Sequence, residues 1–162
     1  MAVNYQELAT GKYYEELEVG NLYKHSITRT VTEADNLLFS TLTYNSAWLH
    51  MDEEYCKATS HGKRLVNSLF TLALANGVTV NDTTLGTTEG NLGFYEVKFT
   101  APVYIGDTLR SETEIVSKRE SKSRPHSGIV EFETRSYNQR DQMVLTFRRA
   151  GMMIKKSSLT AK

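Results

Sequence analysis

The chain has 162 residues, 40% hydrophobic and 23% charged, a composition typical of a globular domain and not of a disordered or fibrous chain. Its 19 Lys and Arg residues balance 19 Asp and Glu residues, which argues against a nucleic-acid or membrane partner. No apolar run approaches the roughly 18 residues of a membrane span, and the first residues have no signal-peptide pattern. We therefore expect one cytoplasmic domain, residues 1–162.

The first part of the chain predicts an arm, a strand and a capped helix. Residues 1–20 are polar and rich in Tyr and Glu, as in an arm that closes against a larger body. Apolar residues recur among polar ones over residues 22–31, which predicts a strand. Thr32 then occupies a helix N-cap position with Asp35 three residues later, and residues 37–42 give that helix an apolar stripe.

The sequence predicts a central buried helix over residues 65–77. Leucines and alanines cover nearly every direction of its helical wheel, and a helix that is apolar all round is buried all round. Gly77 is a suitable end for it. Residues 44–64, before this helix, are irregular, and Asp52 is expected to cap a short helix there.

The second half of the chain changes to a period of two residues. Antiparallel strands are predicted over residues 95–99, 109–116, 129–137 and 143–154, with turn residues between them. A sheet rolled around the central helix is the simplest compact arrangement, because it covers a helix that has no polar face. We therefore predict an α+β fold, a single hot-dog domain in which an antiparallel sheet wraps a long buried helix.

The histidines and the cysteine do not form a known metal or nucleophile pattern. His25, His50, His61 and His126 lack metal-site spacings, and the sequence has no phosphate-binding glycine loop, so no metal and no cofactor are expected. Cys56 has no evident activating base and is expected to pack as a small hydrophobic residue. His25, His61 and His126 are expected to be structural or surface residues.

Three runs carry a more specific pattern: Val31-Thr32-Glu33-Ala34-Asp35, then Tyr44-Asn45-Ser46-Ala47-Trp48-Leu49-His50-Met51-Asp52, then Gly62-Lys63-Arg64-Leu65-Val66-Asn67-Ser68. Together they resemble the MaoC-like dehydratases, the family of (R)-specific enoyl-CoA hydratases. That family has a capped helix, then Gly-Asp-x-Asn-Pro-Leu-His-x-Asp, then Gly-x-Pro-Ile-x-His-Gly at the start of its hot-dog helix. The spacing from Thr32 to His50 matches without a gap, and the resemblance covers about residues 20–155.

The chain departs from the family pattern at functional positions. Asn45 stands at the position of the family's catalytic Asp, and Asn67-Ser68 replace His-Gly. The runs 65–72 and 80–88 resemble a branch of the family linked to mesaconyl-CoA or itaconyl-CoA. The resemblance to that branch implies a short acyl group that is branched or dicarboxylic.

The resemblance implies a hydratase or dehydratase that adds water to a 2-enoyl-CoA thioester and gives a 3-hydroxyacyl-CoA. His50 is expected to take a proton from water and return one to the substrate, because imidazole exchanges protons near neutral pH. Asn45 cannot be a base, so its amide is expected to hold the water or orient the imidazole. The backbone N–H of Ser68, with the Asn67 side chain beside it, is expected to stabilise the oxyanion.

Basic residues outside this catalytic group are candidates for substrate binding. Arg64 is expected to grip a carboxylate of the acyl group with two parallel hydrogen bonds. Arg119, Lys122 and Arg124 lie in the densest basic segment and are candidates for the phosphates of CoA, although such a run is more often a solvated hairpin face. CoA would enter as part of the substrate. Exposed sheet edges further predict a homo-oligomer.

Two other functions remain open from the sequence. A hot-dog acyl-CoA thioesterase would need a carboxylate that activates water, and Asp52, Glu53 and Asp82 are the candidates. A non-catalytic acyl-CoA-binding or regulatory module would keep the fold without turnover. Release of free CoA would favour the thioesterase, and binding without turnover would favour the module.

Overall fold

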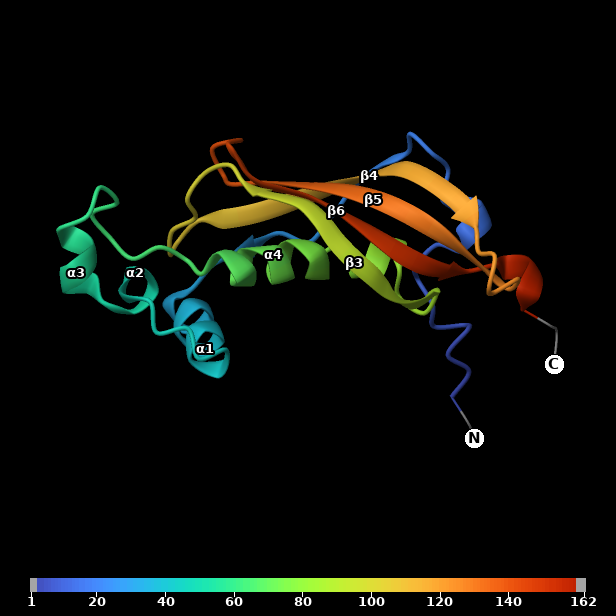
Figure 1. Ribbon diagram of the computed structural model, residues 1–162, viewed down its shortest axis with the longest axis horizontal. Coiled ribbons are helices and arrows are strands. Elements are labelled where there is room, and N and C mark those ends of the chain that lie inside the picture. The colour runs from blue at the N-terminus through green and yellow to red at the C-terminus, as the bar shows by residue number, and fades with distance from the viewer. Residues whose placement is uncertain (1–2, 160–162) are drawn as a thin grey trace.

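The computed structural model describes residues 3–159, so residues 1–2 and 160–162 of the predicted domain lie outside the described part. One antiparallel sheet runs in the order β1-β4-β5-β6-β3, and β2 also pairs with β4. The strands are β1 (Leu22–Lys24), β2 (Arg29–Thr30), β3 (Thr88–Phe99), β4 (Thr108–Glu120), β5 (Ser127–Tyr137) and β6 (Met143–Ile154). Figure 1 shows the sheet as a curved layer over the helices.

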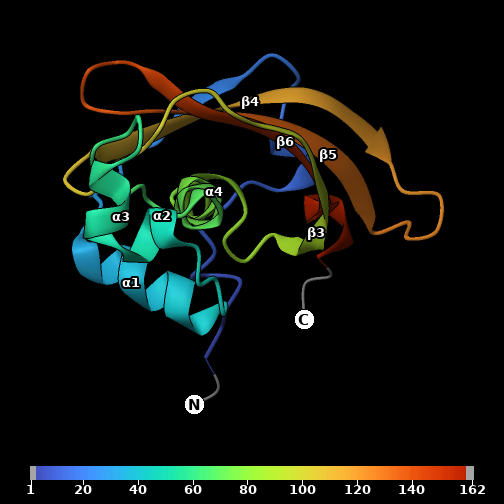
Figure 2. The same cartoon turned by 60° about the vertical axis from the view of Figure 1, so that its left-hand side comes forward.

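The central helix lies under the concave face of the sheet, with the helices of residues 33–57 grouped beside it (Figure 2). The α-helices are α1 (Glu33–Leu42), α2 (Trp48–Met51), α3 (Glu53–Lys57), α4 (Ser68–Gly77) and α5 (Val80–Thr83), with 3-10 turns η1 (Tyr14–Glu16) and η2 (Lys156–Ser158). Between residues 3 and 159, no helix has the length and apolarity needed to cross a membrane.

The predicted start of α1 is confirmed. The Thr32 hydroxyl accepts a hydrogen bond from the Asp35 N–H (3.3 Å), and the Asp35 carboxylate accepts one from the Thr32 N–H (2.8 Å). The predicted apolar stripe is split: Leu38 is 63% exposed, whereas the Phe39 ring packs edge-on against the Phe70 ring of α4, with 5.7 Å between the ring centroids. Asn36 and Ser40 are buried, because this part of α1 packs against the polar start of α4.

The central helix begins later than predicted and is not buried all round. Leu65 and Val66 are extended, and the Val66 N–H donates to the Val103 carbonyl (2.9 Å), so α4 starts only at Ser68. Leu69 is 56% exposed, because the sheet of a single chain covers only one side of α4. The prediction of complete burial is therefore wrong for the single chain.

The strand predictions hold for β4, β5 and β6, and β3 extends seven residues further back than expected, to Thr88. The strand predicted over residues 22–31 is split into β1 and β2. The break falls at His25, whose buried imidazole turns inward to Asp82 (2.8 Å) and Thr113 (2.9 Å). The His25 N–H still donates to the Ser111 carbonyl (3.1 Å), so the pairing with β4 is interrupted only after this residue.

Two apolar clusters hold the layers together. The first lies between α4 and the sheet and includes Val66, Ala75, Leu145 and Phe147. The second forms where the N-terminal arm packs against the sheet: Tyr14, Leu17, Ile115, Val130, Phe132 and Met153. The arm therefore closes against the body of the protein, as its composition predicted.

Arg149 on β6 is a buried guanidinium without a counter-ion. It is 5% exposed, its Cζ lies 4.3 Å from the centroid of the Phe132 ring, and its Nε has no hydrogen-bond partner among the described residues. Burial lowers the pKa of Arg149 to about 10. Because the folded state disfavours the charged form, this destabilisation is fully present at pH 7 and is relieved only as the pH rises above about 10.

We expect Arg149→Met to raise the free energy of unfolding by about 1–3 kcal/mol, because Met fills the space without a desolvated charge. Urea denaturation at pH 7 measures this change. The matched control is Arg148→Met, which removes a neighbouring guanidinium paired with Glu133 and Glu96 and should lower stability by less than about 1 kcal/mol. A variant at Arg149 that is less stable than the control would contradict the expectation.

Candidate active site

A cavity of about 350 Å³ lies at the N-terminal end of α4. His50 and His61 line it together with Ser68 of α4, and residues 99–103 form a largely apolar wall. A few polar groups that converge in a mostly apolar cavity are typical of a small-molecule site. This cavity is therefore the candidate active site.

His50 is held in a defined orientation by the segment that leads into α4. It lies on α2, and its Nδ1 is 3.0 Å from the Leu65 carbonyl, to which it donates. The Leu65 N–H in turn donates to the Leu49 carbonyl (2.9 Å). Since the carbonyl can only accept, we assign the Nδ1–H tautomer, which leaves Nε2 of His50 as a proton acceptor.

Asn36 joins three helices at the edge of this cavity. Its side chain is fully buried, its Nδ2 donates to the His50 carbonyl (2.9 Å), and its Oδ1 accepts from the Asn67 N–H (2.8 Å). A residue of α1 therefore fixes both the catalytic candidate on α2 and the first turn of α4. Sequence reasoning missed Asn36, although a lone amide among the leucines of a short helix was a signal that it has buried partners.

Two neighbouring residues at the start of α4 have different surroundings: the Asn67 side chain is bonded within the protein, and Ser68 lines the cavity. The Asn67 side chain accepts from the Leu69 N–H (3.0 Å) and donates to the Ser40 hydroxyl (3.2 Å), and Asn67 is 1% exposed. The prediction that Asn67 binds substrate is therefore corrected, because its amide is already satisfied. Ser68 lines the cavity, and its backbone N–H has no partner in the described part of the chain. That N–H lies at the positive end of the helix dipole, where a hydrogen-bond donor favours negative charge.

Asn45 lies in the turn before α2 and not on the cavity wall. Its side-chain oxygen accepts from the Ala47 N–H (3.1 Å), and its own N–H donates to the Ser40 carbonyl (2.9 Å). These bonds shape the loop between α1 and α2, a common use of Asn. The structure thus gives Asn45 a positioning role and does not support the predicted catalytic one.

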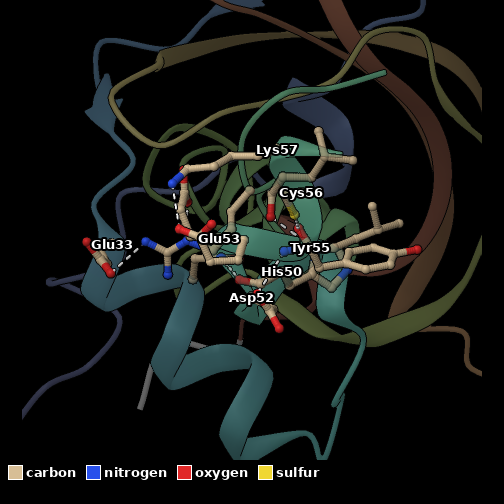
Figure 3. Close-up of polar contacts among 12 residues, drawn as sticks. Glu33, His50, Asp52, Glu53, Tyr55, Cys56 and Lys57 are labelled. Atoms are coloured by element: carbon tan, nitrogen blue, oxygen red, sulfur yellow. Dashed lines mark hydrogen bonds and ion pairs between the residues drawn. The ribbon is translucent and has the colours of Figure 1, made fainter. Parts of the chain in front are cut away.

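Arg64 is neutralised by two carboxylates outside the cavity. Its Nη2 donates to Glu33 (2.8 Å) and its Nε donates to Glu53 (2.9 Å). Figure 3 labels the two glutamates. The hydrogen bond to Glu33, and after it the one to Glu53, are the main causes that raise the pKa of Arg64 above its ordinary value. The expected substrate-carboxylate contact is therefore corrected: Arg64 braces α1 and α3 against the segment before α4.

The basic segment lies at the far end of the sheet. Figure 1 places the turn between β4 and β5 opposite the end that carries α2 and α3. Arg119 and Lys122 are exposed there, and Arg124 pairs with Glu89 (2.8 Å). The structure therefore does not bring these three residues to the cavity of their own chain.

The three carboxylates considered for a thioesterase are engaged elsewhere. Asp52 caps α3 by accepting from the Tyr55 N–H (2.9 Å), as predicted, while Glu53 pairs with Arg64. Asp82 pairs with His25. None of the three lines the cavity in the described part of the chain.

The remaining histidines divide into two groups. His25 is buried and hydrogen-bonded to Asp82, and His126 pairs with Glu89 (2.8 Å). Neither lines the cavity, in agreement with the structural or surface roles predicted for them. His61 instead lines the cavity, which the sequence interpretation missed. Its place directly before Gly62, at the start of the run that opens α4, was the available signal. Residues 3–159 contain no cluster of three or more His, Cys, Asp or Glu side chains placed to hold a metal ion.

The chain belongs to the MaoC like domain family, whose pattern matches residues 15–138. It is 31% identical over 148 residues to the mesaconyl-CoA hydratase of Cereibacter sphaeroides, covering 91% of this chain and 43% of that protein. The chain thus spans less than half the length of this relative.

Solved structures show the same fold. The monoamine oxidase regulatory protein of Archaeoglobus is 31% identical with a TM-score of 0.81, over 90% of this chain and 96% of that one. A Mycobacterium tuberculosis protein described as a double hot-dog fold aligns at 21% identity with a TM-score of 0.83, over 94% of this chain and 47% of that one. The predicted hot-dog fold is confirmed.

We expect Asn36→Ala to lower the free energy of unfolding by about 2–4 kcal/mol, because it leaves the His50 carbonyl and the Asn67 N–H buried without a partner. Urea denaturation measures the loss. The control is Leu38→Ala on the exposed side of the same helix, which should change stability by no more than about 0.5 kcal/mol. Equal effects of the two substitutions would contradict the proposed bridge.

Proposed function

We propose that this protein is a hydratase or dehydratase that adds water across the double bond of a 2-enoyl-CoA thioester, giving a 3-hydroxyacyl-CoA. The observation that carries the proposal is the cavity shared by the His50 imidazole and the first turn of α4. A base and an oxyanion donor at one cavity are the two groups that such an addition needs. The hydratase activity named for the mesaconyl-CoA relative supports the same reaction class.

In the proposed reaction, Nε2 of His50 takes a proton from water while the water oxygen bonds to C3 of the substrate. Negative charge then develops on the thioester oxygen, where the Ser68 N–H donates a hydrogen bond and the α4 dipole adds a favourable field. A single donor of this kind contributes about 10²–10³-fold in rate. The addition of water needs no external oxidant or reductant, so the proposal includes no cofactor other than CoA as part of the substrate.

We further propose a short acyl group, branched or dicarboxylic, as in mesaconyl-CoA. A cavity of about 350 Å³ is at the small end of the range for ligand sites, which supports an acyl group of few carbons. The substrate named for the Cereibacter relative is of this kind. The pantetheine and nucleotide parts of CoA would lie outside the cavity.

The edge of the sheet supports a homo-oligomer. β3 is the last strand in the sheet order, and it exposes Leu92 (53%), Phe94 (41%) and Phe99 (45%). Leu69 on α4 adds a further exposed apolar side chain. An unpaired edge beside apolar side chains is the kind of surface that a second copy covers.

The positions of the acidic residues favour a hydratase over a thioesterase. Asp52, Glu53 and Asp82 are each engaged in a cap or an ion pair away from the cavity lining. A non-catalytic acyl-CoA-binding module would use the same cavity, so only turnover separates it from the proposed enzyme.

The test is to incubate crotonyl-, mesaconyl- and itaconyl-CoA with the wild type and with His50→Ala, and to measure the gain of one water by mass. The wild type should hydrate at least one ester, and His50→Ala should be slower by roughly 10²–10⁴-fold. His126→Ala, remote from the cavity, is the control and should match the wild type. Release of free CoA, or binding of all three esters without turnover, would contradict the proposal.

Arg64→Met separates a bracing role from substrate recognition. Because Glu33 and Glu53 already occupy the guanidinium, the substitution should lower the melting temperature and change the rates on crotonyl- and mesaconyl-CoA by the same factor. Paired kinetic measurements on the two esters test this expectation. A loss confined to mesaconyl-CoA would restore Arg64 as the group that binds the substrate carboxylate.

A further inference from the structure

Two imidazoles face the candidate active site, from different segments of the chain. His50 comes from α2, and His61 comes from the loop between α3 and α4. Among the described residues that line the cavity, these two have the only side chains that exchange protons near neutral pH. Since the Asn45 amide cannot transfer a proton and also lies off the cavity wall, the second group available for proton transfer is His61.

Each ring has an oxygen atom near its Nδ1, a backbone carbonyl for His50 and a phenol hydroxyl for His61. Nδ1 of His50 is 3.0 Å from the Leu65 carbonyl, and Nδ1 of His61 is 3.4 Å from the Tyr104 hydroxyl. When each Nδ1–H donates to its oxygen, Nε2 is the position at which each ring gains or loses a proton. Lys63 is the charged group beside this arrangement, with its Nζ 4.3 Å from the centroid of the Tyr104 ring.

We infer that His61 is a second catalytic residue, the acid that protonates C2 of the substrate after His50 has taken the proton from water. This inference rests on the proposed hydratase function and deepens it. Net addition of water needs one proton removed from water and one delivered to carbon, and two rings in one cavity supply both without an intervening proton exchange.

The proposed step balances in atoms and electrons. The water oxygen bonds to C3, one water proton moves to Nε2 of neutral His50, and the C2–C3 π pair shifts into the enolate of the thioester. The enolate pair then forms the C2–H bond with the proton from Nε2 of protonated His61. His50 ends protonated and His61 ends neutral, and exchange with solvent restores both rings.

The test is His61→Gln on the ester that the wild type hydrates best. Glutamine keeps a hydrogen-bond donor of similar size but cannot transfer a proton, so kcat should fall about 10²-fold while KM changes less than about threefold. The matched control is His126→Gln, in which an exposed histidine remote from the cavity is replaced in the same way and which should match the wild type. A kcat for His61→Gln within about threefold of the wild type would overturn the inference.

A second variant separates proton transfer from a structural role. His61→Ala should be as slow as His61→Gln, and added imidazole should restore its rate at least about tenfold, since the free base can take the vacated place. A slow His61→Ala that imidazole does not rescue would overturn the inference in favour of a structural role. If the wild type hydrates none of the three esters, the proposed function itself fails, and the inference fails with it.

Discussion

One buried amide determines how the site is assembled. The Asn36 side chain donates to the backbone of His50 and accepts from the backbone of Asn67, and both bonds lie inside the protein. Either backbone group would be left without a hydrogen-bond partner if Asn36 moved away, which costs free energy. The helices α1, α2 and α4 therefore cannot shift independently. For this reason α1 presents the buried side chains of Asn36 and Ser40 to the start of α4. Leu38 lies on the exposed side of the helix, whereas Phe39 packs against Phe70 of α4.

The electrostatics of the cavity follow from the same arrangement. The strongest charges nearby, Arg64 with Glu33 and Glu53, neutralise one another outside the cavity and tie the surrounding helices together. In the described lining of the cavity, the polar groups are imidazoles, hydroxyls and the free N–H at the start of α4. Such a site has hydrogen-bond donors but no fixed cation among its described lining residues. It therefore stabilises negative charge that develops on a thioester oxygen during the reaction better than it binds a permanent anion.

The sequence predicts the fold better than the roles of individual polar residues. Local signals were sufficient for the Thr32 cap, the period-two strands and the apolar α4, and the family spacing was sufficient to single out His50. The roles of Arg64 and Asn67 were mispredicted because their partners, Glu33 and Asn36, each lie 31 residues away and meet them only in the folded chain. His61 was missed for a similar reason, since only the folded loop brings it to the cavity that His50 also lines.

The central claim is that the His50 ring and the Ser68 N–H face one thioester. The most direct measurement is a crystal structure of the protein with butyryl-CoA, a saturated ester that cannot be hydrated. The account predicts the thioester oxygen within about 3 Å of the Ser68 nitrogen, with C3 of the acyl chain turned toward Nε2 of His50. A thioester bound away from both groups, with the cavity at the start of α4 left unoccupied, would contradict it.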